Sequence, residues 1–190
     1  VTISSFVLTV RAVNDPPVVG SIPDQATDED TPLGVTFTVE SGLPFPDLGY
    51  TAPMDPYIPD GKAELNKKMH DFMVLYDGLG ICKFYIVVSY GPTILAEWLT
   101  YCTGWKVTPE ELMRTGERIF NTKRLINVGR GLTRKDDYLP KRLLTVPQRD
   151  DIGPVDPEGM ERMLTEYYRL RGWDANGAPT KARLKALHLT

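Results

Sequence analysis

The chain has 190 residues, of which 42% are hydrophobic and 25% are charged, and its formal net charge is −3. This composition is ordinary for a globular protein and excludes the disordered and collagen-like classes. No apolar run reaches the roughly 18 residues that a membrane span needs, and residues 1–12 lack the pattern of a signal peptide. Residues 41–190 carry 21 basic and 19 acidic side chains, so the charge pattern also excludes a strongly basic nucleic-acid-binding protein.

Residues 1–40 predict a short β segment. Hydrophobic and other side chains alternate over residues 5–11 and again over residues 35–40, a period of two that is typical of strands with one buried face. Turn formers and helix breakers fill the stretch between them. Two or three strands cannot bury a core alone, so we expect an incomplete β segment that ends at a seam near residues 40–42.

Residues 41–190 predict a mainly α-helical domain of about five irregularly arranged helices. After a stretch rich in proline and glycine, apolar residues recur at spacings of three and four from Leu65 to Tyr76, which predicts a helix over residues 62–76. The glycines at positions 78 and 80 are expected to end it. The apolar run at residues 84–88 fits either a strand or a buried helical turn, because periodicity does not separate the two.

Local signals predict the remaining helices. Pro92 opens one that ends before Gly104, and the Thr-Pro-Glu-Glu sequence at residues 108–111 is a capping box for a longer helix that extends to about residue 127. An aspartate and proline at residues 156–157 begin the next, which Gly172 ends. Thr180 is expected to cap a last short helix that ends at residue 187.

A turn with two glycines carries the clearest chemical signal. The sequence DGLGICK at residues 77–83 places the carboxylate of Asp77 and the thiol of Cys82 close together at the end of a helix. Glycines let the backbone approach a bound group closely, and a thiolate is a natural iron ligand. The alternative interpretation is that Cys82 is a packed core residue, because free cysteine is among the most buried residue types.

Several blocks in a fixed order resemble one enzyme family. They are GLPFPD (residues 42–47), DGLGICKF (77–84), GW (104–105), TPEEL (108–112), GERIFN (116–121), RKDDYLP (134–140) and EYYRLRGWD (166–174). Over residues 42–189 the chain is similar to the C-terminal region of the tungsten-containing aldehyde ferredoxin oxidoreductase family. The resemblance implies oxidation of an aldehyde to a carboxylic acid, with ferredoxin as the electron acceptor.

The same resemblance implies two cofactors, a tungstopterin or molybdopterin and a 4Fe-4S cluster. Carried over to this chain, Asp77 would contact the pterin and Cys82 would be the fourth cluster ligand. Ile81, where the family commonly has leucine, and Lys83 would lie close to the pterin. We expect the rest of the family's active site, including three closely spaced cluster cysteines, to lie in a part that this sequence does not contain. The resemblance therefore implies no catalytic base here and no aldehyde oxidation by this chain alone.

Residues 1–40 are similar to the junction between two bacterial cadherin-like repeats. Residues 1–13 would be the last strand of one repeat, and residues 18–40 the opening strands of the next. The resemblance makes four residues candidate calcium ligands: Asn14, Asp15, Glu29 and Asp30. Calcium prefers six to eight oxygens, and these residues also suit turns. The second hypothesis is therefore a fragment of a calcium-binding adhesion protein with a non-catalytic helical module. We expect an extracellular location if the cadherin-like segment reflects the protein's function, and a cytoplasmic location if the oxidoreductase-like residues 41–190 do.

The remaining chemically active side chains are interpreted as structural. His70 lies one position off the predicted helical stripe, which favours a surface or boundary position, and His188 lies near the end of the chain. The pair Asp136 and Asp137 is expected to shape a turn. The three tryptophans, Trp98, Trp105 and Trp173, are expected to lie in the core.

Overall fold

The computed structural model describes residues 44–55, 58–88, 91–147 and 153–189, all within the unit Thr31–Thr190. The predicted β segment, the seam and the four candidate calcium ligands lie outside the described residues. No strand occurs in the described part, where the β contacts are two isolated bridges, between Phe45 and Tyr50 and between Trp173 and Pro179. The prediction of a mainly α-helical body is confirmed.

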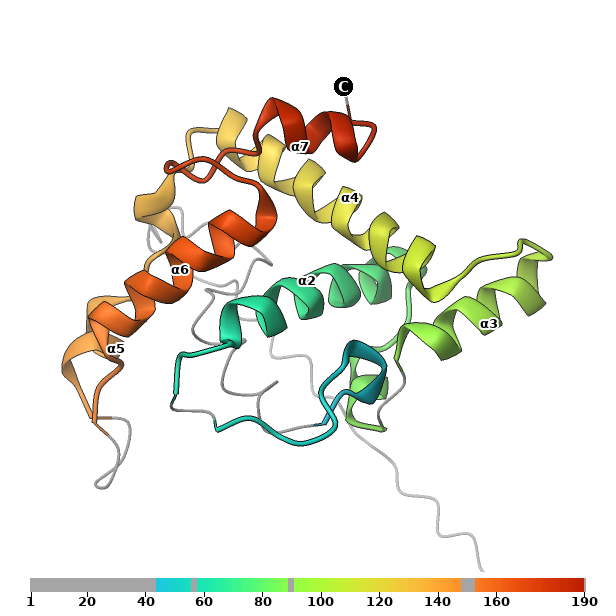
Figure 1. Cartoon of the computed structure of the whole chain (residues 1–190), viewed down its shortest axis with the longest axis horizontal. Helices are drawn as coiled ribbons and strands as arrows, with labels where there is room; N and C mark the ends of the chain where they lie inside the picture. The colour runs from blue at the N-terminus through green and yellow to red at the C-terminus, as the bar shows by residue number, and fades with distance from the viewer. Residues whose placement is uncertain (1–43, 56–57, 89–90, 148–152, 190) are drawn as a thin grey trace, which may run out of the picture. The chain divides into compact units, whose positions relative to one another are not determined.

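The described residues form six α-helices and three 3₁₀ turns, joined by loops (Figure 1). The α-helices are α2 (Lys62–Leu79), α3 (Pro92–Thr103), α4 (Pro109–Gly129), α5 (Lys141–Thr145), α6 (Pro157–Arg171) and α7 (Lys181–Ala186). The 3₁₀ turns are η1 (Pro46–Leu48), η2 (Lys83–Val88) and η3 (Arg134–Asp137). The short α5 has no side-chain cap, and the sequence did not predict it.

Capping residues determine where most of these helices begin and end. Thr108 and Glu111 form the predicted capping box of α4, and the Asp156 side chain accepts hydrogen bonds from two backbone N–H groups at the start of α6. Thr180 caps α7 in the same way. Helix α2 continues three residues beyond the prediction, to Leu79, because its left-handed C-terminal residue is Gly80 rather than an earlier glycine.

Helix α2 lies at the centre of the packing (Figure 1). It packs against α4 and α6, and α4 also packs against α3. A methyl group at Gly116 on α4 would lie only 1.9 Å from the carbonyl oxygen of Asp71 on α2. Only glycine therefore allows the two helices to approach this closely.

Two hydrophobic clusters form the core. The first joins η1, α2, α3 and α4 and contains most of the predicted stripe of α2: Leu65, Met69, Phe72 and Tyr76. The second is built mainly from α6 and includes its methionine and tyrosine face: Met160, Met163, Leu164, Tyr167 and Tyr168. The predicted buried stripe from Leu65 to Tyr76 is confirmed.

Two of the three tryptophans do not lie in the core. Trp173 is buried as predicted, but Trp98 is 38% exposed and Trp105 is 68% exposed. Helix α3 buries Leu95 and Ala96 instead, so Trp98 lies on its outer face. Trp105 directly follows Gly104, the residue that caps the C-terminus of α3.

His70 occupies a boundary position between helices. Its ring is half-buried, stacks on Phe120 with 5.0 Å between ring centroids, and hydrogen-bonds the Tyr167 hydroxyl at 2.8 Å. Burial lowers the pKa of His70 to about 3, and the positive charges of Arg171 and Lys123 act in the same direction. The imidazole is therefore neutral at pH 7 and acts as a packed structural group. His188, by contrast, is exposed.

Candidate functional site

The turn after α2 brings together the residues that the sequence singled out. Gly80 has φ of +67°, and the N–H of Ile81 donates to the Tyr76 carbonyl oxygen at 2.9 Å. This pattern is a Schellman motif, which ends a helix sharply and satisfies its last carbonyls. The side chain of Ile81 is half-buried and packs on the first core cluster. The turn is thus anchored to the core by its apolar residue.

The polar residues of the turn lie on the outer side. Asp77, Cys82 and Lys83 are all exposed, so the interpretation of Cys82 as a core residue is wrong. Lys83 Nζ lies 2.8 Å from Asp77 Oδ1, in an ion pair with both side chains about half exposed. The Cys82 carbonyl accepts a hydrogen bond from the Tyr85 N–H at 3.2 Å, which begins η2. A thiol and a carboxylate are therefore both presented to a group that approaches from outside.

The segment after the turn is neither a strand nor buried where its side chains are described. Residues Lys83–Val88 form the 3₁₀ turn η2, in which Phe84 is 81% exposed and Tyr85 is 45% exposed. Of the two expected alternatives, the helical turn is the one that forms, as a 3₁₀ turn, but the expected burial is wrong for Phe84 and Tyr85. A 3₁₀ turn directs side chains three ways around a narrow axis, so a short apolar run of this kind does not bury all of its members.

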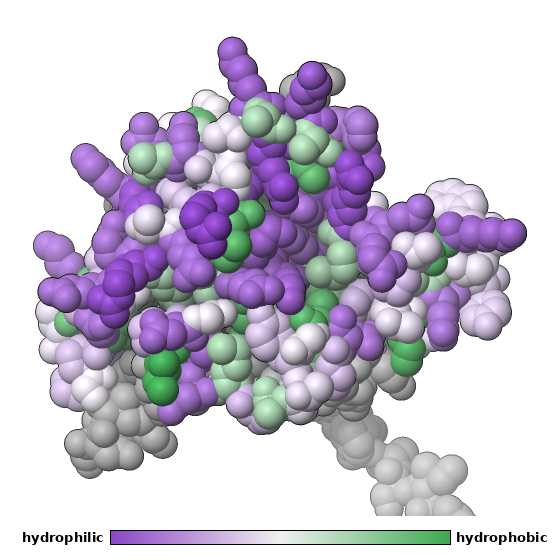
Figure 2. All heavy atoms as spheres, viewed as in Figure 1, coloured by the Kyte–Doolittle hydropathy of each residue, from purple (hydrophilic) through white to green (hydrophobic). Residues whose placement is uncertain are grey.

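Exposed aromatic side chains extend from η2 onto α3. Tyr85 contacts Trp98 edge to face, with 6.2 Å between ring centroids, and Tyr101 is 83% exposed. Helix α3 has a single charged residue, Glu97, among its 12 residues, and pale residues of intermediate hydropathy gather over it at the right of Figure 2. Aromatic residues with few charges are typical of surfaces that another polypeptide covers.

The sequence pattern did not reveal this aromatic surface, which we define as Phe84, Tyr85, Trp98, Tyr101 and Trp105. Trp98 and Trp105 were expected to lie in the core, Phe84 and Tyr85 belonged to the run expected to form a strand or a buried turn, and Tyr101 was not singled out. For Trp98 and Tyr101, the signal that could have found them is the low charge of α3, since a helix with few charges needs cover on more than one face.

Cys102, on α3, is also exposed. It is the second thiol of the chain, and nothing in the sequence marks it as a ligand. The described residues contain no group of three or more histidine, cysteine, aspartate or glutamate side chains suited to hold a metal ion. Any metal at Cys82 would therefore take further ligands from outside the described residues.

None of the described helices has an apolar stretch long enough for a membrane span. The longest, α4, has 21 residues and carries charged side chains along its length.

Comparison with known proteins supports the family resemblance that the sequence blocks indicated. Residues 29–189 match the family model described as aldehyde ferredoxin oxidoreductase, domains 2 and 3. The match begins before the predicted seam and includes Glu29 and Asp30, two of the four candidate calcium ligands. It gives no support to a cadherin-like junction there.

Named relatives are tungsten-containing aldehyde ferredoxin oxidoreductases. The chain is 36% identical to the Pyrococcus abyssi enzyme over 144 residues, an alignment that covers 75% of this chain and 24% of the relative. It is 35% identical to the Pyrococcus furiosus enzyme over 142 residues, an alignment that covers 74% of this chain and 23% of the relative. The chain thus spans about a quarter of the length of these relatives.

A solved structure shares the fold. It is the active site complex BamBC of benzoyl coenzyme A reductase, determined with 1,5-dienoyl-CoA, and it matches with a TM-score of 0.54 and 23% identity. The match covers 69% of this chain and 19% of that one.

Proposed function

Because this chain belongs to the aldehyde ferredoxin oxidoreductase family, we propose that it acts as the C-terminal part of a tungsten-containing oxidoreductase. The complete enzyme would oxidise aldehydes to carboxylic acids and pass the electrons to ferredoxin. The observation that carries the proposal is the turn from Asp77 to Lys83, which is anchored on the core by Ile81 and presents its thiol and carboxylate outward.

The residues of the turn suit the roles that the family resemblance implies. The exposed Cys82 thiol would be one ligand of a 4Fe-4S cluster, because such clusters are held by cysteine thiolates. The Asp77 carboxylate would accept a hydrogen bond from an N–H group of the pterin. Lys83 would orient that carboxylate through the ion pair that it forms with Asp77. The bound tungstopterin and cluster would supply the redox chemistry, which no side chain of the turn can provide alone.

Gly80 supports this assignment through the space around it. A methyl group built on Gly80 would meet nothing within 4 Å, so the outer side of the turn is open to a bound group. Ile81 lies on the opposite side, against the core. We therefore propose that Ile81 acts by holding the turn in place, while Asp77 and Cys82 make the contacts.

The site would be completed by the part of the family polypeptide that this chain does not span. A four-iron cluster needs four ligands, and the described residues contain no group of three or more candidate metal ligands. The aromatic surface on η2 and α3 supports the same conclusion, because it follows the turn directly and suits cover by another polypeptide. We propose that the missing part packs over this surface. An oxygen-sensitive cluster would also favour a reducing, cytoplasmic environment.

An exchange experiment tests the proposal. Residues 29–189 would replace the matching part of the Pyrococcus abyssi relative, and the chimera would be purified without oxygen and assayed for aldehyde oxidation with an artificial electron acceptor. We expect turnover by the chimera and none by this chain alone. Cys82→Ser should abolish turnover, whereas Cys102→Ser, a matched change at another exposed thiol, should retain it. Full turnover by the Cys82→Ser chimera would contradict the proposal.

A further inference from the structure

A cavity separate from the turn opens between η1, α2, α4 and α7. Its volume is about 650 Å³, within the range of sites that bind small molecules. Figure 2 shows a hollow with hydrophilic walls between α2 and α4 on the face toward the viewer. The charged residues that line it are Asp47, Lys67, Lys68, Asp71, Glu110, Arg114, Glu117 and Arg183.

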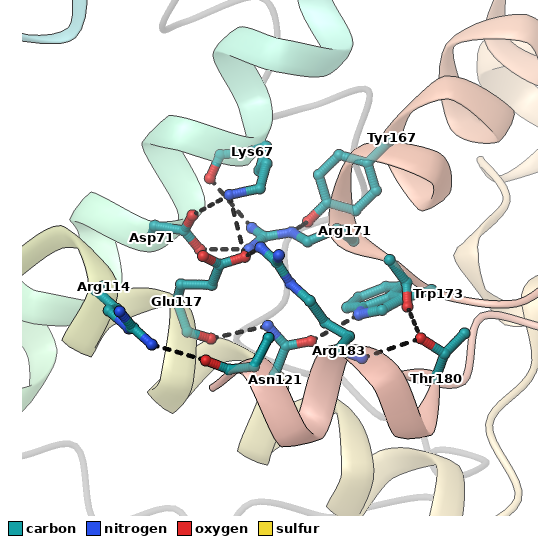
Figure 3. Close-up of polar contacts among 12 residues, drawn as sticks. Lys67, Asp71, Arg114, Glu117, Asn121, Tyr167, Arg171, Trp173, Thr180 and Arg183 are labelled. Atoms are coloured by element: carbon teal, nitrogen blue, oxygen red, sulfur yellow. Dashed lines mark hydrogen bonds and ion pairs between the residues drawn. The ribbon is translucent and has the colours of Figure 1, made fainter. Parts of the chain in front are cut away.

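The ion-pair network at the inner wall of the cavity extends to Arg171, which lies behind the wall, and this network holds more positive than negative charge. Lys67 Nζ lies 3.0 Å from Asp71 Oδ2 and 3.2 Å from Glu117 Oε1. The same two carboxylates also form ion pairs with arginines: Asp71 pairs with Arg171, and Glu117 pairs with Arg183 (Figure 3). Three cations therefore share two carboxylates, which leaves one positive charge without an anion.

This excess charge is largely removed from water. The Arg171 side chain is fully buried, and the side chains of Lys67 and Arg183 are only 18% and 28% exposed. Burial lowers the pKa of Lys67, and the nearby Arg171 and Arg183 act in the same direction, against Asp71. The Nε–H of Arg183 is buried and has no hydrogen-bond partner among the described residues. Crowded cations of this kind are stabilised by an added anion.

Two carboxylates lie at the rim, and helix N-termini engage both, which compensates part of their negative charge. The Thr93 N–H at the start of α3 donates to Asp47 Oδ2 at 3.1 Å, and Glu110 lies in the first turn of α4, where the helix dipole favours a negative charge. Lys68 is paired with Glu64 at 2.9 Å.

Arg114 adds a further cation at the rim. Its Nη2 donates to the carbonyl oxygen of Ala186 at 2.7 Å, and it forms no ion pair with any described residue. Most of its donors are therefore available to a ligand. A guanidinium presents them in a planar fork that matches carboxylate and phosphate oxygens.

We propose that this cavity binds a small organic anion, whose carboxylate or phosphate groups are held by Arg114 and Arg183 with Lys67 behind them. The site uses no residue of the turn at 77–83 and does not depend on a tungsten or iron cofactor. It goes beyond the proposed oxidoreductase function, and the two can fail separately.

Isothermal titration of the chain tests the proposal, with citrate as the carboxylate probe and inorganic phosphate as the second, at constant ionic strength. We expect saturable binding of at least one probe at one site per chain. Arg114→Gln should weaken it about tenfold, the effect of losing one charge-assisted contact. The matched control is Arg162→Gln, which removes an arginine that is 64% exposed on α6 and does not line the cavity. It should leave the affinity within about twofold.

The two probes distinguish the ligand class. Binding of citrate alone would assign the cavity to polycarboxylates, and binding of phosphate alone would assign it to phosphate-bearing molecules. Arg183→Gln is a second variant, whose folding is checked by its melting temperature, and it should weaken the same probe. The proposal is overturned if neither probe binds saturably, or if Arg114→Gln and Arg162→Gln weaken binding equally.

Discussion

The backbone N–H of Ile81 donates to the carbonyl oxygen of Tyr76 at 2.9 Å, and this hydrogen bond closes the turn that leaves Cys82 outside the core. Tyr76 is fully buried and Ile81 packs beside it. The position of the thiol is therefore determined by backbone geometry and core packing, before any ligand binds. This relationship makes the turn a rigid support for a bound group.

Replacing Gly80 should destabilise the turn. Its φ of +67° is unfavourable for a residue with a side chain, so we expect Gly80→Ala to lower the free energy of unfolding by about 1 to 2 kcal/mol. Gly78→Ala is the matched control, because Gly78 lies within α2 and its added methyl would be 3.9 Å from Ile119. It should be neutral or stabilise by up to about 1 kcal/mol. Urea denaturation measures both, and equal effects would contradict the account.

The crossing of α2 and α4 makes a second glycine essential. A methyl group at Gly116 would lie 1.9 Å from the backbone carbonyl oxygen of Asp71, so the two helices must separate. We expect Gly116→Ala to cost about 2 to 3 kcal/mol of unfolding free energy. In the same helix, Gly129→Ala meets nothing within 4 Å and should leave stability unchanged or slightly higher. A Gly116→Ala variant as stable as Gly129→Ala would show that the helices do not approach this closely.

Replacing the buried Arg171 should lower the free energy of unfolding more than replacing an exposed arginine. Arg171 is fully buried, pairs with Asp71 and donates from Nε to the Tyr167 hydroxyl. Arg171→Met would remove these contacts and leave Lys67 as the described cation beside Asp71. We expect a loss of about 1 to 3 kcal/mol in unfolding free energy, because buried hydrogen-bonding groups lose their partner. Arg169→Met, at an arginine that is 72% exposed and 3.9 Å from Glu166, should change it by less than about 1 kcal/mol. Thermal melts of the two variants make the comparison, and similar midpoints would rule out this packing.

His70 should make the protein sensitive to acid. Its folded-state pKa of about 3 lies below the 6.5 of a free imidazole, so the unfolded chain binds a proton that the folded chain excludes. Stability is therefore fully present above the unfolded-state pKa and is lost as pH falls toward 3. Between pH 7 and pH 5 this amounts to about 1 to 2 kcal/mol.

Comparing variants isolates the contribution of His70. His70→Gln should flatten the dependence of unfolding free energy on pH between 7 and 5, whereas His188→Gln, at an exposed position, should leave the wild-type slope. Nuclear magnetic resonance titration of the imidazole measures the pKa directly. A His70 ring that titrates near pH 6.5 would contradict the buried environment.

Local signals in the sequence predicted helix boundaries well. The capping box at Thr108 and the aspartate cap at Asp156 act within one helical turn, so their chemistry can be recognised without knowing the fold. The stripe from Leu65 to Tyr76 likewise follows from helical periodicity. The same local reasoning identified the turn at residues 77–83.

Contacts between distant segments could not be predicted in this way. Asp137 was expected only to shape a turn, yet its carboxylate accepts hydrogen bonds from Arg124 and Tyr168, which belong to two different helices. Asp71 and Arg171 are 100 positions apart, and no periodic pattern links them. Trp98 was assigned to the core because hydrophobicity shows that a side chain needs cover but not which polypeptide supplies it.

The most direct test of the central claim is the iron content of the Pyrococcus abyssi chimera that carries residues 29–189, purified without oxygen as Cys82→Ser and as Cys102→Ser. Iron per chain and the electron paramagnetic resonance spectrum of the reduced cluster would be measured for both. We predict that Cys102→Ser retains the iron and the spectrum of the unmodified chimera, whereas Cys82→Ser loses iron and changes the spectrum. Equal iron content and identical spectra in the two variants would show that Cys82 is not a cluster ligand.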